Sequence, residues 1–423
     1  MSFDVTTTKL GEVTSLIARG VTPSYTEKKK TVVLNQKCIR NNQIDLNLAR
    51  YTDSEKKKIS EEKYIKPFDI LVNSTGVGTL GRIAQVKYVN SPTTADSHIT
   101  IVRPSENIDP IFLGYSLLSQ QRLIESMGEG STGQTELSRI RLAEEIVLRV
   151  PSRVEQEQIG QLLLCIDDKI ELNNAINKNL EEVAQALFKR WFVDFEFPNE
   201  NGEPYKSSGG EFEESELGLI PKGWRVGTLS EICENIFSGG TPSTKNELFW
   251  NGEYNWLSSG ETRSSYIVST EKSITRMGVD NSSTRLAHKY DVVIASAGQG
   301  ATRGQTSICL IDTYINQSVI SLRVKPNKSF PSFLFYNLKN RYDELRQISD
   351  SNSIRGSLTT NMLKKLKIII PPYKIQDDIC TVLAKIIDCS EYYIKQNNNL
   401  SLIRDTLLPK LMSGEIRVPL DQA

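Results

Sequence analysis

The sequence predicts an α+β protein with an internal pseudo-two-fold repeat, in which two strand-rich domains alternate with two long helices. Three observations predict this class. A segment of more than forty residues recurs at a constant offset of 220 positions, both copies have the apolar spacing of a long helix, and short apolar runs with glycine-rich turns precede each copy. We expect the helices to pair as an antiparallel coiled coil, because each needs a partner for its apolar face.

The repeat begins where a proline follows an aliphatic residue, at Val150-Pro151 in the first copy and at Ile370-Pro371 in the second. From there the register holds without a gap. Matched pairs include Ile166 and Ile386, Asp168 and Asp388, Asn177 and Asn397, and Leu187 and Leu407. A repeat of this length at a fixed offset indicates two copies of one architectural unit.

Each copy predicts one amphipathic helix, over residues 153–194 and 373–413, because apolar residues recur at steps of three and four. The mid-helix asparagines allow two interpretations: a solvated face, or an aligned pair, Asn177 and Asn397, that lies in the seam and fixes the register. The apolar positions are Ile159, Leu162, Leu163, Ile166, Ile170, Ile176, Leu180, Val183, Leu187 and Trp191, then Ile379, Val382, Leu383, Ile386, Tyr393, Leu400, Ile403, Leu407 and Leu411.

The repeat divides the chain into five segments. Residues 1–150 and 223–370 are the strand-rich domains, and residues 151–197 and 371–423 contain the helices. Residues 198–222, rich in glycine, serine and glutamate, predict a surface linker. The two domains carry net charges of +3 and +6, whereas 151–197 and 198–222 each carry −4. This alternation suggests different partners for the domains and for the helices.

Composition excludes several classes of protein. With 38% hydrophobic and 24% charged residues, no apolar run of membrane-spanning length and no secretory signal at the N-terminus, we expect a cytoplasmic protein that contacts no membrane. The six cysteines form no CxxC pair and predict reduced, mostly buried thiols. The two histidines, His98 and His288, stand apart from any cluster of metal-ligand residues, so no metal site is expected.

One glycine-rich motif matches the spacing of a dinucleotide-binding loop. Gly76-Val77-Gly78-Thr79-Leu80-Gly81 fits the spacing GxGxxG, but the residues after it alternate like a strand, whereas that motif must open a helix. The matching turn, residues 298–304, breaks the spacing. Either these are structural tight turns, or their backbone amides, with Arg82 and Arg303, approach phosphates or bases.

No catalytic motif is found. Ile370-Pro371-Pro372-Tyr373 resembles the Asn/Asp-Pro-Pro-Tyr motif that binds the target amine in amino-methyltransferases, but it lacks the polar first residue that makes the hydrogen bond. The sequence contains no cofactor loop, no HExxH and no Walker A motif. We therefore expect no catalytic residues and no cofactor.

Five stretches together resemble the specificity subunit of a type I restriction–modification enzyme. The resemblance implies two target-recognition domains, each reading one half of a split double-stranded DNA site. It also implies docking of two methyltransferase subunits on the helices, with restriction subunits joining that core. The stretches are residues 31–40 (TVVLNQKCIR), 238–243 (SGGTPS), the paired glycine-rich loops, 187–195 (LFKRWFVDF) and 407–416 (LLPKLMSGEI).

This resemblance implies candidate functional residues. The aromatic cluster of Trp191, Phe192 and Phe195 either anchors a subunit or caps the core of the helix pair. The candidate DNA-binding residues are Thr22, Asn35, Arg40, Thr75, Gly76, Thr79, Arg82, Gly240, Thr241, Gln299, Thr302 and Arg303, and the candidate subunit-interface residues are Leu187, Trp191, Phe192, Phe195, Leu407 and Leu411.

Two other functions are weighed against DNA recognition. A self-sufficient DNA methyltransferase would bind S-adenosylmethionine as an isolated chain, but it needs the motifs that this sequence lacks. A coiled-coil scaffold with no role in DNA binding is excluded if exchanging this chain for a homologue abolishes DNA binding by the complex.

Overall fold

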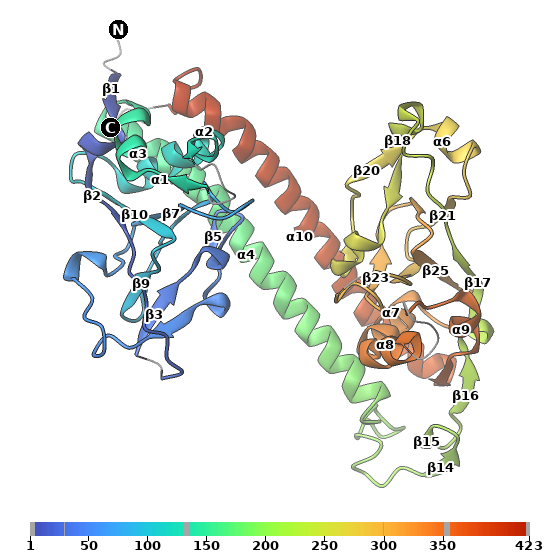
Figure 1. Cartoon of the computed structure of the whole chain (residues 1–423). Helices are drawn as coiled ribbons and strands as arrows, with labels where there is room; N and C mark the ends of the chain where they lie inside the picture. The colour runs from blue at the N-terminus through green and yellow to red at the C-terminus, as the bar shows by residue number, and fades with distance from the viewer. Residues whose placement is uncertain (1–4, 29, 130–134, 299, 351–355, 420–423) are drawn as a thin grey trace. The chain divides into compact units, whose positions relative to one another are not determined.

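The computed structural model describes residues 5–28, 30–129, 135–298, 300–350 and 356–419 (Figure 1). The chain forms two compact units, one of Met1–Ile170 with Asn399–Ala423 and one of Glu171–Asn398. Each unit holds one strand-rich region and a part of each long helix, α4 (Arg153–Phe192) and α10 (Tyr373–Ser413). The predicted helices, 153–194 and 373–413, are therefore present almost to the residue.

The first strand-rich region contains two main sheets. One is antiparallel throughout, and the other pairs β3 with its neighbour β9 in parallel. In spatial order the strands are β2 (Thr14–Arg19), β10 (Ile99–Pro104), β7 (Ile70–Asn73) and β8 (Ile83–Gln85), then β6 (Arg50–Thr52), β3 (Thr31–Leu34) and β9 (Thr93–Ala95). The other elements are β1 (Thr6–Lys9), β4 (Ile39–Arg40), β5 (Gln43–Ile44), β11 (Gly128–Glu129), β12 (Glu136–Leu137), β13 (Val147–Val150), α1 (Pro110–Ser119), α2 (Gln121–Ser126) and α3 (Arg139–Glu145), with 3-10 turns at Leu10–Val13, Gln36–Cys38, Leu46–Leu48 and Glu61–Lys63.

The second strand-rich region repeats this plan with one extra strand in each sheet. In spatial order the strands are β17 (Cys233–Ser238), β25 (Val319–Val324), β22 (Val292–Ala295), β23 (Thr306–Cys309) and β19 (Tyr266–Ile267), then β20 (Lys272–Ile274), β18 (Trp250–Leu257), β24 (Thr313–Ile315) and β21 (Arg285–Ala287). The other elements are β14 (Phe212–Ser215), β15 (Gly218–Pro221), β16 (Arg225–Thr228), β26 (Lys367–Ile370), α5 (Leu229–Ile232), α6 (Arg276–Asp280), α7 (Pro331–Asn340), α8 (Tyr342–Asp350) and α9 (Thr360–Lys365), with 3-10 turns at Glu247–Phe249 and Ser259–Arg263.

A buried ion pair marks the repeat inside both strand-rich regions. Asp69, directly before β7, binds Arg103 of β10 at 2.6 Å, and Asp291, directly before β22, binds Arg323 of β25 at 2.8 Å. Both carboxylates are buried. The gap-free sequence repeat covers only the helices, whereas the structural repeat includes both strand-rich regions.

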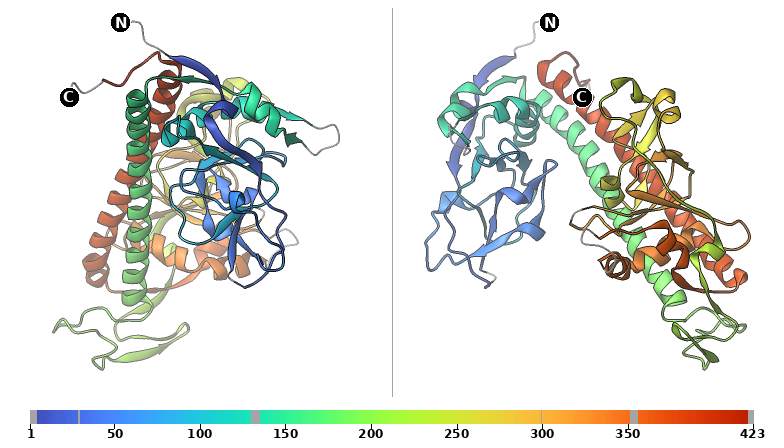
Figure 2. Two further views of the ribbon diagram at one scale, coloured as in Figure 1. Left: turned by 90° about the vertical axis from the view of Figure 1, so that its left-hand side faces the viewer. Right: turned by 45° about the vertical axis from the view of Figure 1, so that its right-hand side comes forward.

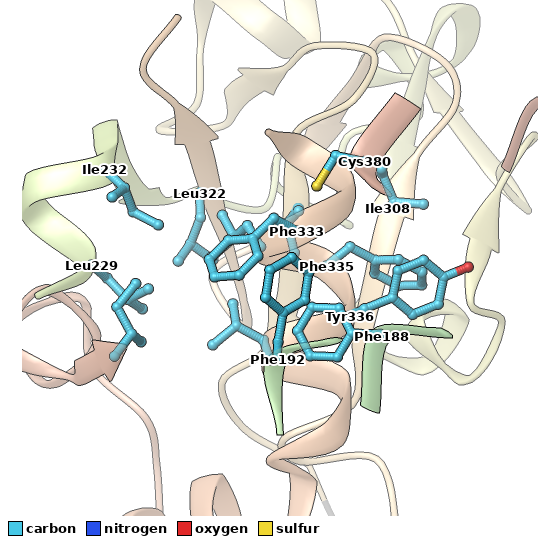
Figure 3. Packing of buried hydrophobic residues seen from close by; sticks show 14 of the residues in the cluster. Phe188, Phe192, Leu229, Ile232, Ile308, Leu322, Phe333, Phe335, Tyr336 and Cys380 are labelled. Carbon is cyan, nitrogen blue, oxygen red and sulfur yellow. The ribbon is translucent and has the colours of Figure 1, made fainter. Parts of the chain in front are cut away.

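Each unit packs the two long helices against its own strand-rich region. In the first unit, Ile159 and Leu163 of α4 share a core with Leu408 and Leu411 of α10. In the second, Phe188 near the end of α4 shares a core with Cys380 and Leu383 near the start of α10, and Figure 3 labels Phe188 and Cys380 in this core. The start of one helix thus meets the end of the other, and Figures 1 and 2 show them side by side. The predicted antiparallel pair is confirmed.

Asparagines of the two long helices pair in the helix seam rather than forming a solvated face. Asn173 is fully buried and donates a 2.8 Å hydrogen bond to Asn397, which in turn donates to Asn174. In an antiparallel pair, repeat-matched residues face each other only at the midpoint of the pairing. Asn397 therefore lies in the seam and bonds to Asn173 and Asn174, one helical turn before its repeat match Asn177.

The segment expected to be a linker is folded. Within residues 198–222, β14 and β15 form an antiparallel hairpin, with Phe212 opposite Pro221. Just before this segment, Phe197 stacks on Tyr205 and on Trp224, with ring centroids 4.6 and 5.0 Å apart. Aromatic side chains therefore fix this segment against the end of α4.

Candidate nucleic-acid interface

In the first strand-rich region, the ends of several strands meet at one edge. Strands β2, β7, β3 and β9 end there, and β8 and β10 begin there, because their registers place these termini opposite one another. The loops that follow gather into one surface, here called the first loop edge: residues 20–24, 35–38, 74–82 and 96–98. The equivalent loops form the second loop edge: residues 239–243, 258–264, 296–298, 300–304 and 316–318.

Polar side chains tie the loops of the first loop edge together. Thr79 Oγ1 donates to Gln36 Oε1 at 3.0 Å, and Thr75 Oγ1 lies 2.8 Å from His98 Nδ1. Asn73 also donates through its amide to the Gln36 carbonyl at 3.0 Å. Hydroxyl, amide and imidazole groups are the groups that hydrogen-bond to base edges and phosphates.

A glycine is required where each loop edge begins. A Cβ atom on Gly20 would lie 2.1 Å from the Ala95 carbonyl oxygen, and one on Gly239 would lie 1.9 Å from the Ile315 carbonyl oxygen. The amide of the following residue donates to that same oxygen in both copies, at 2.8 and 3.0 Å. This shared geometry makes Thr22 the counterpart of Thr241.

The second loop edge is held by a different set of side chains. Thr241 donates through its hydroxyl to Gln317. Trp256 Nε1 donates to the Gly240 carbonyl at 3.2 Å, and Arg263 donates to Thr302 Oγ1 at 3.4 Å. The two loop edges therefore share one backbone frame but carry different polar groups.

The two glycine-rich turns align at Gly81 and Gly304. Their φ angles are 82° and 84°, and their amides donate to the last residues of β7 and β22, respectively. Arg82 follows its glycine, is half-buried, and donates to the Gly78 carbonyl at 2.8 Å. Arg303 precedes its glycine. The two arginines therefore do not occupy equivalent positions.

Arg303 is buried, which corrects the expectation that both arginines lie at the surface. The residue is 9% exposed, and its guanidinium binds Asp350 and the Gly356 carbonyl. Two residues that the sequence did not suggest fix the same turn from α8. Arg346 donates to the Gly300 carbonyl at 2.6 Å, and the Tyr342 hydroxyl donates to Ala301 at 2.9 Å. Their spacing on an ordinary helix gives no signal of this role.

The remaining candidate DNA-binding residues differ in exposure. Thr22 and Arg40 are exposed, and Arg40 lies in the short β4–β5 hairpin. Asn35 uses its side chain within the fold, accepting from the Lys37 amide and donating to the Leu48 carbonyl. Gly76 has a φ angle of 99°, Gly240 and Thr302 are buried, and Gln299 lies outside the described residues.

The aromatic cluster at the end of α4 belongs mainly to the core. Phe192 is buried and meets Phe333 edge-on at 5.0 Å, and Figure 3 shows both among the packed rings. Trp191 and Phe195 are half-buried against the same cluster. Leu411 is buried in the first unit. Phe192 and Leu411 are therefore corrected from interface to core residues, whereas Leu187 and Leu407 remain partly exposed.

Several apolar positions assigned to the helix seam point outward. Three pairs matched by the repeat are 38% to 60% exposed: Leu162 with Val382, Leu172 with Tyr392, and Val183 with Ile403. Periodicity alone placed Leu162, Val183, Val382 and Ile403 in the seam. The same apolar side chains are thus uncovered on both helices; these six residues are called the repeated apolar face.

The described residues contain no grouping of three or more side chains suited to hold a metal ion. Burial raises the pKa of the Cys233 and Cys380 thiols to about 12, which disfavours the reactive thiolate. In the described part of the chain, no helix has the length and apolar character to span a membrane.

Comparison with known proteins gives consistent matches along the chain. A family model described as the type I restriction modification DNA specificity domain matches residues 3–182 and again residues 221–401. The chain is 25% identical to the type I restriction enzyme HindI specificity subunit of Haemophilus influenzae, over 84% of this chain and 88% of that one. It is 26% identical to the MjaIX specificity subunit of Methanocaldococcus jannaschii, over 84% and 81%.

A solved structure has the same fold. The crystal structure of a type I restriction–modification S subunit from M. genitalium matches with a TM-score of 0.63 at 16% identity. The match covers 97% of this chain and 96% of that one.

Proposed function

We propose that this chain, which belongs to the type I restriction–modification DNA specificity family, reads a split DNA site with its two loop edges. The chain is a specificity subunit, a component that recognises DNA and does not catalyse. The observation that carries the proposal is that the same loop edge is built twice, on the same strand registers and the same obligatory glycine. Each copy would contact one half-site.

Domain boundaries follow from this assignment. Residues 1–150 and 223–370 are the two target-recognition domains. Residues 151–197 and 371–423 contribute the helices between them, and residues 198–222 connect the first helix to the second domain as a folded segment.

The contacts to DNA differ between the two domains. In the first domain the exposed hydroxyl of Thr22, the threonines of the 74–82 loop, Arg82 and Arg40 are available for bases or phosphates. In the second, Thr241 and the exposed backbone of Gly300 are available. Arg303 is a positioning residue that holds the second loop edge through Asp350.

We also propose that two methyltransferase subunits dock on the helices, one on each copy of the repeated apolar face. Three apolar side chains on each helix lie uncovered at matching positions. A surface present twice on one chain fits two copies of the same partner. Restriction subunits would join this core, and the docked subunits would supply the chemistry that this chain lacks.

Sequencing of methylated bases in a host with and without this chain tests the proposed function. We expect a bipartite motif that depends on the chain. Exchanging residues 223–370 for the matching residues of another specificity subunit should then change one half of the motif only. A motif in which both halves change, or neither, would contradict the assignment of one domain to each half-site.

A further inference from the structure

Each strand-rich region holds a cation over an aromatic ring. In the first region the Arg50 guanidinium carbon lies 3.5 Å from the centroid of the Tyr25 ring, and Tyr25 is 43% exposed. In the second, Lys272 Nζ lies 5.6 Å from the Trp250 ring. Both cationic residues are exposed.

The two cations occupy the same position in the repeated fold. Arg50 begins β6 opposite Val33, the residue before the end of β3. Lys272 begins β20 opposite Trp256, which is followed by the end of β18. Because β3 and β18 lead into the loop edges, each cation lies opposite the second-last residue of the strand that enters its loop edge.

The aromatic partners come from different elements. Tyr25 lies in the loop after β2, whereas Trp250 begins β18. The two domains therefore share the position of the cation and the presence of a ring beneath it, although the ring is supplied in two different ways.

Neither cation is part of a described ion pair. Among the residues that the structure describes, neither Arg50 nor Lys272 has a carboxylate partner. Other arginines of these domains do have one, such as Arg19 with Glu136 at 2.7 Å. An aromatic ring beneath a cationic side chain limits the motion of that side chain but does not cancel its charge. The N–H groups on the side away from the ring can still donate hydrogen bonds. Such a group is prepared to bind an anion.

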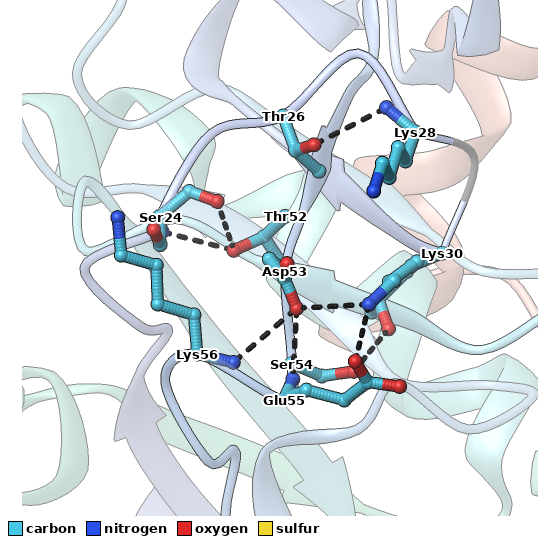
Figure 4. Close-up of polar contacts among 10 residues, drawn as sticks. Ser24, Thr26, Lys28, Lys30, Thr52, Asp53, Ser54, Glu55 and Lys56 are labelled. Atoms are coloured by element: carbon cyan, nitrogen blue, oxygen red, sulfur yellow. Dashed lines mark hydrogen bonds and ion pairs between the residues drawn. The ribbon is translucent and has the colours of Figure 1, made fainter.

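Hydrogen bonds hold the residue before Tyr25, and Figure 4 shows them between Ser24 and Thr52. The Ser24 amide donates to Thr52 Oγ1 at 2.9 Å, and the Thr52 hydroxyl donates back to the Ser24 carbonyl at 3.1 Å. The nearby acids Asp53 and Glu55 bind Lys30, at 3.3 and 2.5 Å. The local acids thus neutralise Lys30 rather than Arg50.

We propose that Arg50 and Lys272 bind backbone phosphates of duplex DNA beside the two half-sites. This inference rests on the proposed function of the loop edges. The loop edges of the two domains carry different polar groups, so a feature that both domains share cannot encode a difference between their half-sites. What the two half-sites have in common is the phosphodiester backbone, which positions a protein without specifying sequence.

The test uses the complete complex with its methyltransferase subunits and a duplex that carries both half-sites. The dissociation constant is measured from 50 to 200 mM salt for Arg50→Ala and Lys272→Ala. Each change should weaken binding at least roughly threefold and make the slope of log affinity against log salt shallower by about 0.9, with the recognised motif unchanged. Arg50→Lys should retain most of the slope.

Matched controls are Lys9→Ala and Lys222→Ala, because both lysines are exposed and bound to a glutamate, at 2.6 and 2.5 Å. They should leave affinity and slope unchanged. Unchanged affinity and slope in Arg50→Ala and Lys272→Ala would overturn the inference, and so would relaxed specificity at one base, which would mean base reading. The loop-edge proposal fails by a different result: the methylated motif would stay unchanged after residues 223–370 are exchanged.

Discussion

The hydroxyl of Tyr115 donates a 2.6 Å hydrogen bond to Asp167, which attaches the first strand-rich region to helix α4. Its counterpart Tyr336 lies 3.3 Å from the Tyr266 hydroxyl, which donates to Glu181 of the same helix at 2.6 Å. Each region is therefore attached to α4 through a carboxylate, directly in one copy and through a second tyrosine in the other.

The Glu181 contact should make stability depend on pH. Burial opposes ionisation, but the Lys339 ammonium at 2.6 Å and the Tyr266 hydroxyl outweigh it, so the pKa of Glu181 is lowered from 4.5. A lowered folded-state pKa stabilises the fold above pH 4.5, and this stabilisation is lost as the pH falls through the folded pKa. Glu181→Gln should cost roughly 1–3 kcal/mol at pH 7 and progressively less in acid.

Denaturant unfolding at pH 7 and at a pH below the lowered pKa measures this difference. Glu182→Gln, at an exposed neighbouring position, is the control and should have little effect at either pH. A destabilisation of Glu181→Gln that stays constant between the two conditions would argue against the ionic contact.

Alanine at Gly20 or Gly239 should damage recognition by one domain only. The new Cβ would meet a backbone oxygen at 2.1 or 1.9 Å, so the loop must move away from its strand. We expect at least roughly tenfold weaker binding, about 1.4 kcal/mol, for duplexes that carry the affected half-site. Gly260→Ala, in the same loop edge as Gly239 and with its nearest neighbour 3.8 Å away, should bind normally. Equal affinities for all three variants would refute the geometric requirement.

Lengthening the helix pair should change the distance between the half-sites. Four residues inserted after Ala175 and four after Lys395, near the midpoint of the pairing, would add roughly 6 Å to each helix. We expect a motif with unchanged half-sites and a different spacer. The same insertion in α4 alone should break the pairing and abolish activity or alter the spacer. Recovery of the original spacer from an active protein would rule out the helices as its determinant.

Charge on the repeated apolar face should disrupt assembly without unfolding the chain. Leu172→Lys and Tyr392→Lys alter exposed matched positions, so each should remove one methyltransferase subunit, and the double variant should remove both. Native mass measurement gives the stoichiometry. Lys178→Ala is the control, because Lys178 projects from the same helix about 120° around its axis from Leu172. Two bound subunits in the double variant would contradict the docking proposal.

Phe192→Ala should act on folding rather than on assembly. The ring is buried against Phe333 and Trp224, so its loss leaves a cavity that should cost about 3–5 kcal/mol. Thermal unfolding of the chain measures this cost. If the variant kept its stability but bound the methyltransferase subunits more weakly, Phe192 would be an interface residue and the prediction would be wrong.

The sequence predicted the architecture well because its signals are periodic. The helix spacing and the fixed offset placed α4 and α10 almost to the residue, and antiparallel pairing followed from two matched apolar faces. The same periodicity could not separate seam from surface, since Leu162 and Leu163 both satisfy steps of three and four. Only packing determines that Leu163 is buried and Leu162 is not.

The candidate site was less predictable because it depends on contacts between distant residues. Gly239 needs its small size because of Ile315, and Arg303 is buried because Asp350 lies within reach. The sequence around Gly239 and Arg303 gives no signal of these contacts. The cation at Arg50 was missed for a similar reason, because Tyr25 reaches it from a separate loop.

The division of the chain into units has a consequence for its synthesis. The second unit is one continuous stretch, Glu171–Asn398, whereas the first needs residues from both ends of the chain. Leu408 and Leu411 complete the core around Ile159 and Leu163, and the ribosome makes them only after the whole second unit. Because domains fold as their residues emerge, we expect the second unit to close first. Although most of the first unit is translated earlier, part of its apolar core would stay exposed, and accessible to chaperones, until Leu408 and Leu411 have been made.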